Sequence, residues 1–165
     1  MRQVSLVLLI KEKNKKKKIL LAMKKRGFGK GRWNGVGGKI DLEKGDKGVL
    51  CSAIRETEEE IGVKIKDPER VAVMNFHFPE VPKEKDFDQQ VHVFLVKDWT
   101  GEPKETEEMT PKWFNLDKIP FDQMWDDDKH WLPHVLEEKK LKAKFVFDKE
   151  EKIADQNIEI IEKFE

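Results

Sequence analysis

The sequence has a single cysteine, no long hydrophobic run and no surplus of charge of either sign. Cys51 cannot form an internal disulfide, and no histidine with an asparagine or aspartate accompanies it in a nucleophile pattern, which favours a reducing, cytoplasmic environment. The apolar run at the start of the chain ends at Lys11, is too short to span a membrane and lacks a small-residue cleavage site, so we expect a first strand there. The 33 basic residues balance the 33 acidic ones, which argues against a nucleic-acid polymer as partner and suits a free nucleotide better.

Length and hydrophobic pattern predict one α/β domain. A chain of 165 residues suits a single domain over residues 1–165, and no repeat or linker divides it. We expect a monomer. Strands are predicted at residues 4–11, 19–25, 71–78, 90–98, 112–114, 144–148 and 156–161, with a lysine-rich turn at 14–18 and a short strand before Ile40. Helices are expected at 49–61 and 128–141, the second capped by Asp127 or Asp128. Mixed strands with two helices on opposite faces suit a three-layer sandwich, a β-sheet between helices.

Four acidic residues crowd into five positions of the first predicted helix, at 56 and 58–60. Like charges three or four apart on a helix repel by roughly 0.2–0.5 kcal/mol per pair, so a bound cation would explain why Glu56, Glu59 and Glu60 can share one face. Hard divalent cations such as Mg²⁺, or else Mn²⁺, bind such oxygen clusters. The alternative is a solvated acidic face on an ordinary surface helix. The helical period puts an apolar set on a separate arc, which we expect to be buried: Leu50, Ala53, Ile54, Thr57 and Ile61.

The acidic run also matches a known pattern. Residues 55–63, Arg-Glu-Thr-Glu-Glu-Glu-Ile-Gly-Val, resemble the second half of the Nudix hydrolase signature, Arg-Glu-aliphatic-x-Glu-Glu-x-Gly-aliphatic. The resemblance implies the Nudix fold, a mixed sheet sandwiched between helices. It also implies that Glu56, Glu59 and Glu60 bind metal, and that Arg55 orients the loop and helix through an ion pair.

The loop before this helix departs from the family pattern. A Gly-Gly-Lys run ending at Lys39 resembles the start of the signature, but three more residues separate it from Arg55 than the pattern has. Lys47 stands where the family has a glutamate. We therefore expect a loop insertion within residues 40–49, with Asp46 or Glu43 taking the place of the missing glutamate.

The resemblance continues along nearly the whole chain and narrows the substrate. The runs at 23–39, 91–94, 107–109, 113–114 and 120–128 are similar to the MutT-like branch of the family, which hydrolyses oxidised purine nucleoside triphosphates of the 8-oxo-dGTP and 2-hydroxy-dATP type. The resemblance implies nucleotide pool sanitation, a purine nucleoside triphosphate as partner and a Mg²⁺ cofactor. It implies that Asn34, Trp125, Asp127 and Asp128 hold the base, that Phe28, Phe76, Phe78, Met109 and Trp131 line its pocket, that Gly37 and Gly38 contact substrate, and that Gly38 also serves the metal.

The chemistry of these residue types suits a purine. A base needs an aromatic slot, which Trp125 and Phe28 could supply, and hydrogen-bonding groups at its edge. Asn34 carries a donor and an acceptor. Asp127 and Asp128 could share one proton, because two neighbouring carboxyl groups do not both ionise cheaply, and the pair would then both donate to and accept from the base. The alternatives are ordinary core packing for each aromatic residue and a solvated helix N-terminus for the two aspartates.

Hydrolysis of a triphosphate requires that the negative charge of the phosphate oxygens is neutralised and that a water is aligned with the bond that breaks. By resemblance Glu108 is a further metal ligand or the base. Lys24 and Lys39 are candidate phosphate contacts. The glycines between 27 and 38 follow neither the dinucleotide register nor the P-loop register, because Ile40 stands where the P-loop hydroxyl belongs. Other nucleotides, dinucleoside polyphosphates, and a catalytically silent domain that senses a nucleotide remain the alternative functions.

Overall fold

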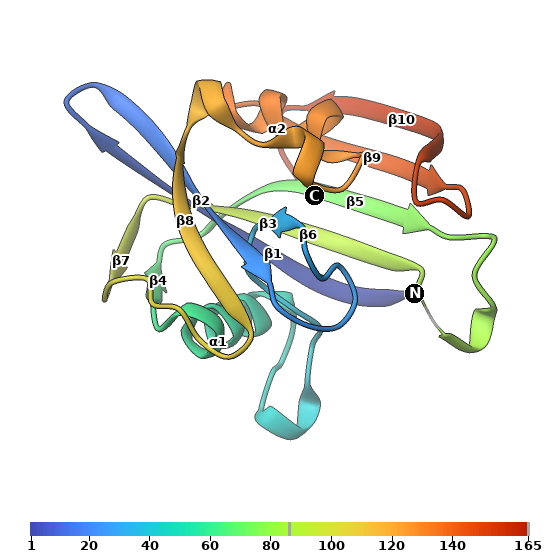
Figure 1. Ribbon diagram of the computed structural model, residues 1–165, viewed down its shortest axis with the longest axis horizontal. Helices are drawn as coiled ribbons and strands as arrows, with labels where there is room; N and C mark the ends of the chain where they lie inside the picture. Colours follow the sequence, from blue (N-terminus) through green and yellow to red (C-terminus); the bar gives the residue numbers. More distant parts are fainter. Residues whose placement is uncertain (86, 165) are drawn as a thin grey trace.

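A mixed eight-stranded β-sheet lies between two helices in the computed structural model, which describes residues 1–85 and 87–164 (Figure 1). Its strands are β1 (Arg2–Lys13), β2 (Lys16–Lys24), β3 (Trp33–Asn34), β5 (Glu69–His77), β6 (Gln89–Val96), β8 (Met109–Asn115), β9 (Lys140–Phe147) and β10 (Ile153–Ile161). They follow the order β10-β9-β5-β6-β1-β2-β3, with β8 paired to β2. The β1–β6 and β5–β9 pairs are parallel and the others antiparallel. Two short strands, β4 (Lys64–Lys66) and β7 (Asp98–Thr100), form a separate pair.

Helices α1 (Val49–Ile61) and α2 (Asp128–Leu136) pack on opposite faces of the sheet. The central strand β1 is buried on both sides, as its nearly continuous apolar run requires. Its Leu8 joins the core under α2 with Trp131, whereas Val7 and Leu9 join the core under α1. The predicted three-layer arrangement is confirmed. No helix within residues 1–85 and 87–164 combines the length and apolar character needed to cross a membrane.

Helix α1 has the predicted ends but presents a different face to the sheet. Gly62 ends it in the left-handed conformation with φ of 73°, which glycine adopts without strain. Ala53, Thr57 and Ile61 are buried as expected. The prediction was wrong for Leu50 and Ile54, which are 45% and 39% exposed, while Glu60 is buried. The helix is therefore rotated so that one carboxylate of the acidic run faces the sheet.

The second helix is shorter than predicted. It ends at Leu136, because the chain reverses at Glu138 (φ of 65°) and then enters β9, which pairs in parallel with β5. The predicted cap by an aspartate side chain is also wrong, since Asp127 makes no such capping hydrogen bond. The lysine-rich turn is narrower than expected, because Asn14 and Lys15 alone form it, both with positive φ.

In the part of the chain that the structure describes, four 3₁₀ helices connect the main elements: Leu42–Lys44, Lys83–Lys85, Leu116–Lys118 and Phe121–Gln123. The first of them occupies the predicted loop insertion before α1. The loop that it forms leaves the sheet after Lys39 and returns to α1 at Val49, so it lies beside the acidic helix.

Candidate functional site

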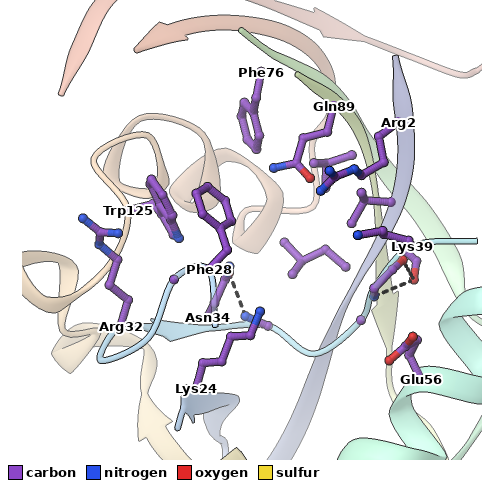
Figure 2. A pocket seen from close by; sticks show the side chains of 18 of the residues that line it. Arg2, Lys24, Phe28, Arg32, Asn34, Lys39, Glu56, Phe76, Gln89 and Trp125 are labelled. Carbon is purple, nitrogen blue, oxygen red and sulfur yellow. Dashed lines mark hydrogen bonds between the residues drawn. The ribbon is translucent and has the colours of Figure 1, made fainter. Parts of the chain in front are cut away.

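A cavity of about 680 Å³ opens between the sheet, α1 and the start of α2. This volume lies in the range of small-molecule sites. Figure 2 shows Phe28, Phe76 and Trp125 around one part of it, and Lys39 and Glu56 at another. The predicted site residues that line the cavity are Lys24, Phe28, Asn34, Gly37, Gly38, Lys39, Glu56, Glu60, Phe76, Phe78, Glu108, Met109, Trp125, Asp127, Asp128 and Trp131. The structure therefore brings most of the predicted set to one space.

One end of the cavity gathers carboxylates. Glu60 is only 4% exposed, and burial, together with the hydrogen bond and charge of Glu56 and the charge of Glu108, raises the pKa of Glu60 to about 9, against the opposing charge of Lys24. Its Oε2 atom is buried and has no hydrogen-bond partner among the described residues. A buried carboxylate oxygen without a partner is costly, so this end is built for a ligand that supplies positive charge.

The donors at this end fit a hard divalent cation. Carboxylate oxygens are the ligands that Mg²⁺ prefers, and Mg²⁺ usually takes only one or two of them and keeps several waters. No group of three or more aspartate, glutamate, histidine or cysteine side chains in residues 1–85 and 87–164 lies close enough together to hold a metal ion on its own. Such an open arrangement suits a metal that is shared with substrate phosphates, and the unpartnered Glu60 oxygen is the position that a cation would satisfy.

Arg55 holds the inserted loop against α1. Its Nε and Nη2 donate to the two carboxylate oxygens of Asp46 at 3.0 and 2.7 Å, and its Nη1 donates to Glu56 and Glu59 at 3.1 Å each. The Arg55 guanidinium holds the pKa of Asp46 below its ordinary value. Of the two candidates for the missing glutamate, the structure places Asp46 against Arg55, whereas Glu43 is exposed. The insertion therefore keeps the ion pair that the resemblance implies.

Glu59 and Arg55 do not line the cavity. Glu59 is 44% exposed and pairs with Arg55 and, at 3.5 Å, with Lys44. Glu56 reaches the cavity and the Arg55 pair together. In this structure Glu56 and Glu60 thus face the cavity, and Glu59 faces the loop.

Two glycines let the chain pass close to the carboxylates. A Cβ on Gly37 would lie 2.1 Å from the Ser5 carbonyl oxygen, so this position does not admit a side chain, and a Cβ on Gly38 would lie 2.7 Å from the Glu56 carboxyl group, which would have to move. The Gly38 carbonyl accepts hydrogen bonds from the hydroxyls of Ser5 and Ser52. These two serines, which the sequence did not single out, fix the glycine segment beside Glu56.

Aromatic side chains form the other end. Phe28 and Trp125 lie 5.0 Å apart between ring centroids with a tilt of 41°, which is direct ring contact. The two rings leave no room for a base between them, so a base in this slot would lie against a ring face that is open to the cavity. Phe87 adds a further wall 4.5 Å from Phe28. A lone aromatic residue in a polar loop gives no periodic signal, so the sequence did not identify it.

Arg32 lines the cavity beside Trp125 and contacts its ring. Its guanidinium carbon lies 4.0 Å from the centroid of a Trp125 ring, and its Nη2 donates to Glu151 at 3.0 Å. A cation over an indole face is attracted to the ring quadrupole. The turn between β9 and β10 therefore holds the indole ring in place through Arg32.

Two buried aspartates lie at the aromatic end. The Trp131 indole N–H donates to Asp127 Oδ2 at 2.7 Å. Burial raises the pKa of Asp127 to about 6, and burial with the charge of Asp127 raises the pKa of Asp128 well above its ordinary value. Asp128 Oδ2 is buried and has no hydrogen-bond partner among the described residues. The pair can thus hold a proton near neutral pH and present a donor and an acceptor to a ligand.

The chain is similar to known proteins both in sequence and in fold. A model of the NUDIX domain matches residues 1–135. The chain is 40% identical over 147 residues to the oxidized purine nucleoside triphosphate hydrolase of Mus musculus, over 89% of this chain and 90% of the relative. It is 38% identical over 145 residues to the protein of that name from Danio rerio, over 88% of each chain. A MutT protein from Bacillus halodurans has a similar fold, with a TM-score of 0.79 and 22% identity over 96% of this chain and 98% of the other.

Proposed function

Because the chain belongs to the Nudix hydrolase family, we propose that it hydrolyses oxidised purine nucleoside triphosphates, such as 8-oxo-dGTP and 2-hydroxy-dATP, to the monophosphate and pyrophosphate. The two curated relatives carry this substrate class in their names. The product pair follows from the addition of water across the phosphoanhydride bond that joins the α and β phosphates, which breaks that bond and releases the monophosphate and pyrophosphate.

One observation carries the proposal. A single cavity has an unpartnered carboxylate oxygen at each of two places, Glu60 Oε2 among carboxylates and Asp128 Oδ2 among aromatic side chains. Each is costly when empty of a ligand. A metal-bound triphosphate attached to a purine satisfies both at once, because its anionic end brings a cation and its base brings hydrogen-bonding groups.

The residues at the carboxylate end of the cavity would bind the metal and the phosphates. Glu56 and Glu60 would hold Mg²⁺, or Mn²⁺, with Glu108 as a further ligand or as the base that takes the proton of the attacking water. A bound divalent cation neutralises phosphate charge and lowers the pKa of a coordinated water. Lys24 lines the cavity beside Glu60 and can contact the phosphates, as can Lys39.

The base end selects the purine. Trp125, Phe28 and Phe87 provide apolar surface for its faces, which is worth about 1–3 kcal/mol per base in stacked complexes. Asn34 and the Asp127–Asp128 pair provide the polar edge. Because the aspartates share protons, they can meet a purine edge that oxidation has changed from acceptor to donor or the reverse.

Pyrophosphate release with Mg²⁺ tests the proposal. The substrates are 8-oxo-dGTP, 2-hydroxy-dATP, dGTP, dATP and diadenosine polyphosphates. We expect kcat/KM for an oxidised purine to exceed that for its normal counterpart by about tenfold or more, since polar readout of a base edge discriminates strongly. Equal rates on all nucleotides would contradict the role of the aspartates, and binding without turnover would indicate a sensing domain.

Substitutions on α1 locate the chemistry. Glu60→Gln and Glu56→Gln should each lower kcat by about 100-fold or more while the fold is retained, since each removes a charge that holds the metal. Glu58→Gln is the matched control, because Glu58 is exposed on the same helix and does not line the cavity. Near-normal turnover in both cavity variants would reject the metal assignment.

A further inference from the structure

The loop between β7 and β8 crosses the C-terminal end of α1 and carries Glu108. We propose that Thr106 in this loop is a positioning residue, which fixes Glu108 relative to Glu60 by joining the loop to the end of the helix. This inference rests on the proposed function, because it assigns a purpose to the placement of Glu108 in triphosphate hydrolysis. It identifies a residue that neither touches the cavity nor carries charge.

On one side, Thr106 contacts the C-terminal end of α1. The last four carbonyl groups of an α-helix have no partner within the helix. Two of these carbonyls in α1 receive donors from the loop: the Thr106 hydroxyl donates to the Glu60 carbonyl at 2.9 Å, and the Lys104 N–H donates to the Ile61 carbonyl at 2.9 Å. The loop thus caps the helix at the residue whose side chain enters the cavity.

On the other side, Thr106 contacts the backbone of its own loop. The same Thr106 hydroxyl accepts the backbone N–H groups of Glu108 at 3.3 Å and Met109 at 3.2 Å. The Thr106 N–H donates to the Met109 carbonyl at 3.0 Å, and Lys25 Nζ donates to the Thr106 carbonyl at 2.7 Å. One hydroxyl therefore binds the helix end on one side and the backbone of Glu108 on the other.

Glu108 needs such a support because its own side chain has little to hold it. The side chain is 55% exposed, and its ion pair with Arg26 is 3.6 Å long. Exposed ion pairs of this kind contribute little to holding a geometry. The charge of Glu108 nevertheless reaches Glu60. Its position over the carboxylates is consequently set by the backbone, and Thr106 is the side chain that fixes this backbone to α1.

Replacement of Thr106 by valine tests the role, since valine keeps the shape and removes the hydroxyl. We expect kcat for an oxidised purine triphosphate to fall by about 10- to 100-fold, because a displacement of about 1 Å at a reacting group has an effect of this size. KM, and the affinity for the nucleoside monophosphate measured without metal, should change by less than about threefold, since the base end is untouched. Thr106→Ser should restore kcat to within about threefold of the wild type.

Thr110→Val is the matched control. Thr110 lies four residues further along, and its hydroxyl bonds the Glu105 side chain at 3.4 Å rather than any part of α1. This variant should keep the wild-type kcat. If Thr106→Val does not fold, as judged by circular dichroism and thermal unfolding, Thr106→Ala takes its place with the same expectations.

A double-mutant cycle separates positioning from general stability. If Thr106 acts through Glu108, then Thr106→Val added to Glu108→Gln should lower kcat by less than about twofold more. An equal loss in both backgrounds, or a wild-type kcat in Thr106→Val alone, would overturn the inference. A wild-type chain that hydrolyses none of the nucleotides would instead overturn the proposed function, so the two failures are distinguishable.

Discussion

Replacement of Asp127 by asparagine should make the protein more stable and less selective. Asp127 is buried, accepts the Trp131 indole N–H at 2.7 Å, and has its pKa raised by burial from 3.8 to about 6. Asparagine has the same shape, keeps an oxygen for the indole N–H and carries no charge. The substitution therefore removes the penalty of a buried negative charge while it retains the hydrogen bond.

The size of the effect follows from proton linkage. A pKa difference of about 2 units between the folded and unfolded chain corresponds to about 3 kcal/mol. Between pH 3.8 and 6 the folded protein keeps a proton on Asp127 that the unfolded chain has lost, so the stability of the wild type falls as pH rises through this window. Above pH 6 the penalty is fully present. We expect the asparagine variant to gain about 1–3 kcal/mol at pH 7.5, since Asp128 shares the proton with Asp127 and spreads the shift over the pair.

Urea unfolding at pH values from 4 to 8 measures the gain. The two proteins should be nearly equal at pH 4 and should diverge by pH 6.5, and the melting temperature at pH 7.5 should rise by about 2–4 °C per kcal/mol for a chain of this length. The selectivity for oxidised over normal purines should fall by about tenfold, because an amide cannot exchange its donor for an acceptor.

Asp126→Asn is the control, because it should change the stability of the protein in the opposite direction. The backbone N–H of Ile153 donates to Asp126 at 2.9 Å and lowers the pKa of Asp126. Its ionised form is therefore stabilised by folding, and that stability is lost as pH falls through the lowered pKa, so Asp126→Asn should destabilise the protein at pH 7.5. A less stable Asp127→Asn protein at pH 7.5, or a gain that does not vary with pH, would refute the reasoning.

Three further results are expected. Asp46→Asn should destabilise the fold by about 1–3 kcal/mol in urea unfolding and should slow turnover about tenfold, since Arg55 loses a charged, two-pronged partner, whereas Lys47→Gln in the same loop should change neither. Phe87→Ala should raise KM for an oxidised purine about tenfold and leave kcat within about twofold in steady-state kinetics, because it removes one wall of the base site. Chelation by EDTA should abolish turnover but should change the affinity for the nucleoside monophosphate by less than about threefold in calorimetry.

The sequence predicted the two ends of α1 correctly, but it predicted only part of the buried face of the helix. Gly62 and the helical period define where the helix stops, because these are local properties. Periodicity cannot decide which apolar arc meets the sheet, so it assigned Leu50 and Ile54 to the interior, where the structure has Glu60. A helix under selection for packing alone would bury the leucine. In the structure the carboxylate of Glu60 is buried while Leu50 and Ile54 stay exposed.

Long-range pairing explains the remaining differences. Residues 137–139 favour a helix locally, yet the chain must turn there for β9 to reach β5, which is distant in the sequence. Thr106 and Phe87 lie in polar loops, and their roles depend on α1 and on Phe28. Neither role has a local pattern, so only the assembled structure reveals it.

The cavity has two carboxyl groups with an oxygen that lacks a hydrogen-bond partner among the described residues, and their negative charge is compensated in different ways. We expect this difference to set the direction in which the substrate binds. Glu60 lies near Glu56 and Glu108, so further negative charge is repelled there unless a cation accompanies it. Asp128 lies beside Asp127 in an aromatic enclosure, and a shared proton reduces the charge of that pair to −1 without any cation. A metal-bound polyanion therefore suits only the first end and an uncharged ring with a polar edge only the second. We therefore expect a nucleoside triphosphate to bind in one direction, with its phosphates beside α1, whichever purine it carries.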